Sequence, residues 1–176
     1  MAMLTRVSLW TALVSSLVLL FSTGCRADSD EAARVDISGT LIKPPCTATF
    51  PTSQSVAVPK VNLNTLKAGS ADWTDVALGF KCTAGSQVKV RFTAANGTYD
   101  ANTLRTSLDR LGLKTRLSDI TSTVREVDLK LDEQLVFPVL DTTLALKLSV
   151  MPVKTAEELP AIGSYSATLL MEVEYL

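Results

Sequence analysis

The sequence predicts an all-β domain built as an antiparallel sandwich. Alternation of apolar and polar residues with a period of two dominates over helical spacing, and the alternating segments are short and separated by Gly, Pro, Asn, Asp and Ser. The chain of 176 residues has room for one domain of ordinary size and a targeting segment. Hydrophobic residues make up 47% and charged residues 20%, which is typical of a globular chain and excludes a disordered one.

Four internal segments place alternate apolar residues on one face and are expected to be strands. They are residues 76–82, 88–92, 111–117 and 127–131. After the second of them, Asn96-Gly97 indicates a hairpin turn.

The following part of the chain predicts an edge, a long strand and a short helical turn. Residues 135–140 are apolar but contain Pro138, which favours an edge strand or the entry to a loop. Residues 144–150 alternate as a long strand that Pro152 is expected to close. Residues 155–159 fit one helical turn.

Both ends of the mature chain carry alternating segments. Residues 165–175 place apolar side chains and two tyrosines on one face, so the chain ends within a strand. Residues 35–43 also alternate, but Pro44-Pro45 cannot continue a ladder of backbone hydrogen bonds. The first alternating segment is therefore expected to be separate from the body of the sheet.

The N-terminus predicts a secretory signal at residues 1–27. This segment has no acid, carries Arg6 early and continues into an apolar run over residues 7–21 that is shorter than the roughly 20 residues of a membrane-spanning helix. Residues 22–25 permit another interpretation, because Ser-Thr-Gly-Cys is similar to a bacterial lipoprotein cleavage box in which Cys25 would receive lipid. The alternative function is then a lipid-anchored surface or periplasmic β-sandwich protein.

Export also determines the expected state of the remaining cysteines. Once the signal is removed, Cys46 and Cys82 are left in a chain bound for an oxidising compartment, where cysteine pairs normally form disulfides. A redox or metal site is the alternative, but the sequence has no C-x-x-C motif and no histidine.

Composition argues against an enzyme and against a nucleic-acid partner. The absence of histidine removes Ser-His-Asp and Cys-His catalysis, and a formal charge of -1 from 17 basic and 18 acidic residues leaves no basic footprint. Acid pairs such as Asp72 with Asp75 are expected in turns or on exposed faces, so we assign no catalytic residue, metal, cofactor or small-molecule substrate. Trp73, the sole mature tryptophan, and Tyr99 are expected to serve packing rather than glycan binding. The other acid pairs are Asp132 with Glu133 and Glu157 with Glu158.

Five features together resemble bacterial fimbrial subunits of the chaperone-usher route, particularly minor or adaptor pilins of P-pilus type. They are the extension with Ile-Ser-Gly-Thr-Leu at 37–41, Pro-Pro-Cys at 44–46, the second cysteine at the end of the segment 78–82, Gly163 fourteenth from the C-terminus, and the penultimate Tyr175. The resemblance implies an incomplete immunoglobulin-like sandwich, a pilin domain lacking its last strand, with an N-terminal donor-strand extension. It divides the chain into a signal peptide (1–27), an extension (28–45) and a pilin domain (46–176).

The resemblance also implies two sets of site residues. In the extension, the donor-strand residues that would face a neighbour's groove are Val35, Ile37, Gly39, Leu41 and Lys43. In the family, glycine stands where donor and groove backbones approach closely, and Gly39 matches it. The strand beside the open groove, which would receive a strand from a chaperone or a neighbouring subunit, comprises Gly163, Tyr165, Ala167, Leu169, Met171, Val173, Tyr175 and Leu176.

Function and partners follow from the same resemblance. It implies a structural subunit that a periplasmic chaperone captures, an outer-membrane usher exports, and neighbouring pilus subunits join by donor-strand exchange into an adhesive fimbria on the cell surface. Its station stays open among adaptor, tip-fibre, rod and terminator subunits, and the resemblance favours a minor or adaptor subunit. No separate lectin domain fits in the chain, so a glycan-binding tip adhesin is disfavoured.

Overall fold

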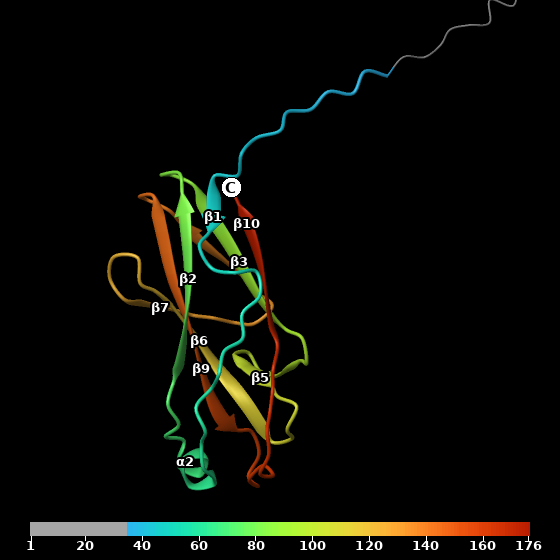
Figure 1. Ribbon diagram of the computed structural model, residues 1–176, viewed down its shortest axis with the longest axis vertical. Helices are drawn as coiled ribbons and strands as arrows, with labels where there is room; N and C mark the ends of the chain where they lie inside the picture. The colour runs from blue at the N-terminus through green and yellow to red at the C-terminus, as the bar shows by residue number, and fades with distance from the viewer. Residues whose placement is uncertain (1–34) are drawn as a thin grey trace, which may run out of the picture. The chain divides into compact units, whose positions relative to one another are not determined.

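The computed structural model describes residues 35–176 and is nearly all-β (Figure 1). The folded body spans Ile42–Leu176. The segment 35–41 contains no helix or strand. The expected signal peptide and the alternative lipidation site at Cys25 lie outside the described residues. The elements of the body are β1 (Cys46–Ala48), α2 (Leu63–Ala68), β2 (Thr74–Cys82), β3 (Gln87–Ala94), β4 (Thr98–Asp100), β5 (Thr103–Arg105), β6 (Leu111–Asp119), β7 (Arg125–Val127), β8 (Gln134–Pro138), β9 (Thr143–Lys154) and β10 (Leu169–Tyr175).

The strands form two antiparallel sheets. The larger has the order β1-β2-β9-β6-β5-β4, with β7 paired to β6 off this path, and the smaller has the order β10-β3-β8. In the larger sheet, β9 lies between β2 and β6 and pairs with both along most of its length. The predicted antiparallel sandwich is therefore confirmed.

The core lies between the two sheets and follows the alternation that the sequence predicts. On β3, Val88, Val90 and Phe92 are at most 1% exposed. The inward residues of β2, β6 and β9 meet them from the larger sheet, and the fully buried Leu117 and Leu146 are among these. Each of these strands therefore buries one face and leaves the other to solvent or to the sheet's outer surface.

A short helix, α2, was not predicted from the sequence. Asn62 caps its N-terminus by accepting a hydrogen bond from the backbone N–H of Thr65 at 2.9 Å. Gly69 ends it in the left-handed conformation with φ of 64°. Leu66 is its buried residue. An asparagine cap followed by a glycine stop is the signal that could have indicated this helix.

The hairpin expected at Asn96-Gly97 is wrong, although the turn itself is present. Gly97 has a positive φ of 79° and donates its N–H to the carbonyl of Ala94. However, β3 pairs with β8 and β10, whereas β4 pairs with β5 in the other sheet. The turn thus connects the two sheets, because both neighbours of β3 come from distant parts of the chain.

Pro152 does not close its strand, contrary to the prediction, because β9 continues to Lys154. The pairing of β2 with β9 ends at Thr74 opposite Val150. Beyond Val150, no backbone carbonyl of β2 is paired with a backbone N–H of β9. On the other side, Pro152 lies opposite Leu113 of β6. Beyond Val150, β9 is in effect an edge strand, and a proline without an N–H is tolerated there.

Two further expectations are corrected by the fold. Of the predicted strand 127–131 only Val127 lies in a strand, at the end of β7 (Arg125–Val127), while Leu129 and Leu131 are buried without strand pairing. Residues 155–159 form bends rather than a helical turn. At Leu129 and Leu131 the apolar pattern is satisfied by packing in the core cluster, which does not require regular backbone hydrogen bonds.

Candidate functional site

The C-terminal strand β10 forms one edge of the smaller sheet. It pairs with β3 from Leu169 opposite Ala94 to Tyr175 opposite Val88, and no strand of the described chain pairs with its other side. The strand is shorter than the predicted 165–175. Ser166 and Thr168 bond instead to the neighbouring loops, where the backbone N–H of Ser107 reaches the Ser166 carbonyl at 2.9 Å.

The inward face of this segment packs against the core but is only partly buried. Every inward residue contacts the core cluster, yet none is fully buried. We call these residues the β10 inner row: Tyr165, Ala167, Leu169, Met171, Val173 and Tyr175. Directly opposite on β3, Val90 is 0% exposed. The two strands therefore share a pattern and differ in burial, because β3 has a neighbour on both sides and β10 on one.

The edge of the larger sheet approaches β10 at one end of the sandwich, where Figure 1 shows β1 and β10 next to each other. Phe80 of β2 contacts the Tyr175 ring edge-to-face at 6.4 Å between ring centroids. Phe50, which follows β1, also contacts the Phe80 ring edge-to-face, at 5.3 Å between ring centroids. The ring contacts of Phe50, Phe80 and Tyr175 thus link the edge of the larger sheet to the last residue of the β10 inner row.

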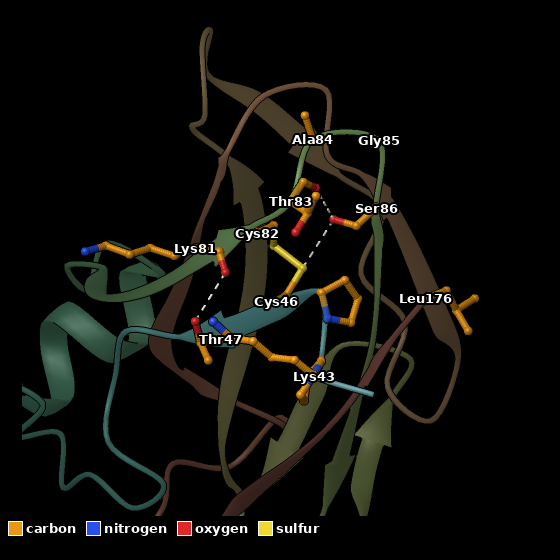
Figure 2. A pocket seen from close by; sticks show the side chains of 12 residues that line it. Lys43, Cys46, Thr47, Lys81, Cys82, Thr83, Ala84, Gly85, Ser86 and Leu176 are labelled. Atoms are coloured by element: carbon orange, nitrogen blue, oxygen red, sulfur yellow. Dashed lines mark hydrogen bonds between the residues drawn. A yellow bond between two sulfur atoms is a disulfide. The ribbon is translucent and has the colours of Figure 1, made fainter. Parts of the chain in front are cut away.

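The end of the chain is held to β3 by backbone hydrogen bonds. The N–H of Gln87 reaches the Leu176 oxygen at 2.8 Å, and the N–H of Leu176 reaches the Gln87 carbonyl at 3.0 Å. Beside it lies a pocket of about 600 Å³ (Figure 2). The start of β1 and the β2–β3 turn also line this pocket. Lys43, Lys81, Ser86 and Leu176 are among its lining residues. Leu176 is therefore partly exposed at a pocket that two lysines also line.

The predicted disulfide between Cys46 and Cys82 is present at this pocket (Figure 2). The two cysteines are direct cross-strand partners of β1 and β2. Cys46 is 2% exposed, and its sulfur lies 3.4 Å from the Ser86 hydroxyl. The bond ties the short strand β1 to the larger sheet at the side facing β10.

The extension residues are exposed along the described segment. Val35 is 79%, Ile37 92% and Leu41 100% exposed. Gly39 has no heavy atom within 4 Å of a Cβ built on it. Lys43 is exposed and lines the pocket.

Gly163, expected beside the groove, lies in an exposed bend before β10 rather than in the strand. A Cβ added at this glycine would lie 4.0 Å from Leu108 Cδ1, its nearest heavy atom. Gly163 therefore belongs to the loop that leads into the β10 inner row.

The aromatic residues considered for glycan binding are covered by the chain's own arginines. The Arg116 guanidinium lies 4.4 Å from the centroid of the Trp73 ring, and that of Arg105 lies 4.7 Å from the Tyr99 ring. One face of each ring therefore lies against an arginine of the same chain, and the packing role of the two rings stays a prediction.

The acid pairs are exposed, as predicted, and several carboxylates have structural partners. Glu158 pairs with Arg110 at 2.6 Å. The Ser149 hydroxyl donates to Asp75 at 2.5 Å, and with Lys147 it lowers the pKa of that carboxyl below its ordinary range. Within residues 35–176, no group of three or more His, Cys, Asp or Glu residues is arranged to hold a metal ion.

Residues 35–176 match the family described as "Fimbrial protein". The chain belongs to this family. The fimbrial protein is thus a structural protein of surface fimbriae and not an enzyme, as the sequence predicts. No curated protein matches the sequence significantly. No helix in the described part of the fimbrial protein is long and apolar enough to cross a membrane.

Solved structures show that the fimbrial protein has the immunoglobulin-like fold of chaperone-usher pilus subunits. A chain from a chaperone-usher pilus, whose structure addresses rod uncoiling, is 16% identical with a TM-score of 0.60, covering 84% of this chain and 97% of that chain. The P pilus adaptor subunit PapF is 16% identical with a TM-score of 0.50, covering 76% and 97%. The P pilus rod subunit PapA is 17% identical with a TM-score of 0.50, covering 75% and 99%.

Proposed function

We propose that this chain polymerises by donor-strand exchange, receiving a strand along β10 and donating its own extension to a neighbouring subunit. The observation that carries the proposal is the incompletely buried β10 inner row at a sheet edge with one neighbour. An unpaired edge next to incompletely buried apolar side chains is completed by an added strand, which supplies backbone hydrogen bonds and covers the row.

The extension has the properties of the complementary half. Its alternating apolar residues Val35, Ile37 and Leu41 are largely exposed. Each would bury an apolar side chain when the segment joins a neighbour's sheet. Gly39 would allow the closest approach of the two backbones, and Lys43 would end the apolar face with its stem packed and its amine in solvent.

Assembly requires that the open edge be protected before polymerisation. We infer that a periplasmic chaperone lends a strand along β10 and binds the carboxylate of Leu176 with basic residues, and that an outer-membrane usher then exports the subunit. The exposed Leu176 beside the pocket supports the part of this proposal in which its carboxylate is bound. The division into a signal peptide at 1–27, an extension at 28–45 and a pilin domain at 46–176 belongs to the same proposal.

The decisive experiment replaces Gly39 by Leu. In the chain itself a side chain at this position meets nothing within 4 Å, so folding and chaperone binding should be unaffected. Inside an acceptor groove the same side chain would collide with the neighbouring backbone. We expect G39L to leave periplasmic subunit levels unchanged and to reduce incorporation into isolated fimbriae at least about tenfold, a loss of about 1.4 kcal/mol or more in strand pairing.

Ser38→Leu is the matched control, because it adds the same side chain at the adjacent position, which faces the opposite side of a strand. S38L should be incorporated close to the wild-type level. Fimbriae of unchanged composition from G39L would contradict the donor role of the extension.

We further propose a minor or adaptor station in the fibre. The sequence features that resemble minor or adaptor pilins of P-pilus type motivate this station, whereas the likeness to PapF and to the rod subunit PapA is nearly equal and does not separate the two. The test is the number of copies per fibre in isolated fimbriae. A minor or adaptor subunit would contribute a small fraction of the fibre mass, whereas a subunit making up most of the mass would be the rod subunit.

A further inference from the structure

The solvent-facing side of β10 carries acids at the open edge. Glu172 and Glu174 alternate with the inner row and are exposed, with side-chain exposures of 71% and 54%. Each lies directly opposite a basic residue of β3. Lys89 pairs with Glu174 at 3.4 Å, and Arg91 pairs with Glu172 at 3.5 Å. The basic partners therefore stand one strand inside the sheet, and the acids stand at its margin.

A strand added beside β10 would lie closer to Glu172 and Glu174 than to their basic partners on β3. Adjacent strands lie about 4.8 Å apart, so the added strand is one spacing from Glu172 and Glu174 and two spacings from Lys89 and Arg91. Screening at physiological ionic strength acts over about 8 Å, which weakens the more distant charges more than the nearer ones. The margin of the sheet therefore favours basic side chains on the solvent-facing positions of an added strand.

This chain's own extension presents an acid there. With Val35 and Ile37 facing the core, the period of two turns Asp36 to the solvent side. Strand pairs throughout the described sheets are antiparallel, so an added strand that continues them brings its N-terminal part to the C-terminal half of β10. Asp36 then stands beside Glu174 or, in a register shifted by two, beside Glu172.

We propose that the acidic margin of β10 selects a donor strand from a different subunit, one with Lys or Arg on its solvent-facing positions, and disfavours a second copy of this chain's extension. The inference rests on the proposed function and adds the chemistry of the preferred partner. Cross-strand charge pairs at exposed positions change affinity modestly, about 2- to 5-fold each. The margin thus biases the choice among strands that already fit the inner row.

The test uses the mature chain in complex with its chaperone and synthetic peptides of residues 28–45. The wild-type peptide is compared with Asp36→Ser and Asp36→Lys peptides by their dissociation rates after strand exchange. We expect dissociation of the D36S complex to be about 2- to 5-fold slower than that of the wild-type complex, and of the D36K complex about 10-fold slower. The advantage of the D36K peptide should shrink between about 0.05 M and about 0.5 M salt.

Two controls locate the effect. On the subunit variant E172Q/E174Q, whose folding is checked by its melting temperature, the advantage of the D36K peptide should disappear. A Thr40→Lys peptide makes a comparable change further along the strand, beside Leu170, and should gain less than D36K.

Equal dissociation of wild-type and D36K peptides, or an equal gain from T40K, would overturn the inference while leaving donor-strand exchange intact. Failure of every peptide to displace the chaperone would instead overturn the proposed function together with this inference.

Discussion

The two edges of the smaller sheet, β8 and β10, differ in how they are finished. β8 is short, contains Pro138 at its end, and buries its inward Phe137 to 2% exposure. β10 is longer, contains neither proline nor glycine, and leaves its inner row only partly buried. Natural proteins protect sheet edges by short strands and prolines, and here only the β8 edge carries such protection. The β10 edge therefore lacks both of these devices, as the proposed strand addition requires.

The largest expected effect comes from shortening the β10 edge. Deleting Glu174–Leu176 removes the two backbone hydrogen bonds between Leu176 and Gln87 and the ring contact of Tyr175 with Phe80. It also moves the terminal carboxylate away from the pocket. We expect a loss of most periplasmic subunit, about tenfold or more by immunoblot, because an uncaptured subunit is degraded.

Leu176→Ala is the control for this deletion, since it preserves chain length and the position of the carboxylate. It should retain near-normal levels. Normal levels after the deletion would show that the C-terminal end is dispensable for capture.

The next largest effect is expected from removing the disulfide between β1 and β2 of the larger sheet. Replacing both Cys46 and Cys82 by Ser removes the cross-link between β1 and β2, which closes a sequence separation of 36 residues. Chain-entropy estimates give a loss of about 3 to 4 kcal/mol in the free energy of unfolding. Denaturant unfolding of the chaperone-free mature chain under oxidising conditions measures it, with the reduced wild type as the comparison. A loss below about 1 kcal/mol would mean that β1 is held by its strand pairing alone.

A matched valine pair sharpens the comparison of burial. Val90 and Val173 are direct cross-strand partners, but Val90 is 0% exposed whereas Val173 is only partly buried. We expect Val90→Ala to cost about 2 kcal/mol in the free energy of unfolding and Val173→Ala about 1 kcal/mol or less. When a donor peptide occupies the edge, the cost at Val173 should rise toward that at Val90, because the added strand completes its burial. Equal costs in the uncomplemented chain would mean that the edge is already closed.

The smallest effect lies on the outer face of the larger sheet, away from the open edge. Hydrogen bonds from Ser149 and Lys147 lower the pKa of Asp75 below its ordinary value of 3.8. Its contribution to stability is therefore complete above pH 3.8 and is lost as the pH falls through the lowered pKa.

We expect the stability difference between wild type and Asp75→Asn to be about 0.5 kcal/mol or less near neutral pH, because the side chain is half-exposed, and to vanish in acid. Unfolding titrations at several pH values measure it. The difference should be the same with and without a bound donor peptide, and a change on peptide binding would show that the two sheets are coupled.

Much of the fold could be predicted because strand patterns are local. The alternation in β2, β3, β6 and β9 identified their buried faces, and the two cysteines in an exported chain predicted their disulfide. The turn at Asn96-Gly97 was also found locally, but its role was not, since the partners of β3 lie far away in sequence. Pro152 was misjudged for the same reason, because its tolerance depends on where β2 stops pairing with β9.

For the candidate site, too, part could be predicted from local sequence and part depended on the tertiary structure. The sequence by itself determined which residues of the C-terminal segment share a face, because side-chain direction in a strand alternates with every residue whatever its neighbours are. Only the tertiary structure decided that this face belongs to an edge, with Val173 only partly buried while its partner Val90 is buried. Burial depends on how many strands lie alongside, and those neighbours are set by pairings between distant segments that no local pattern records.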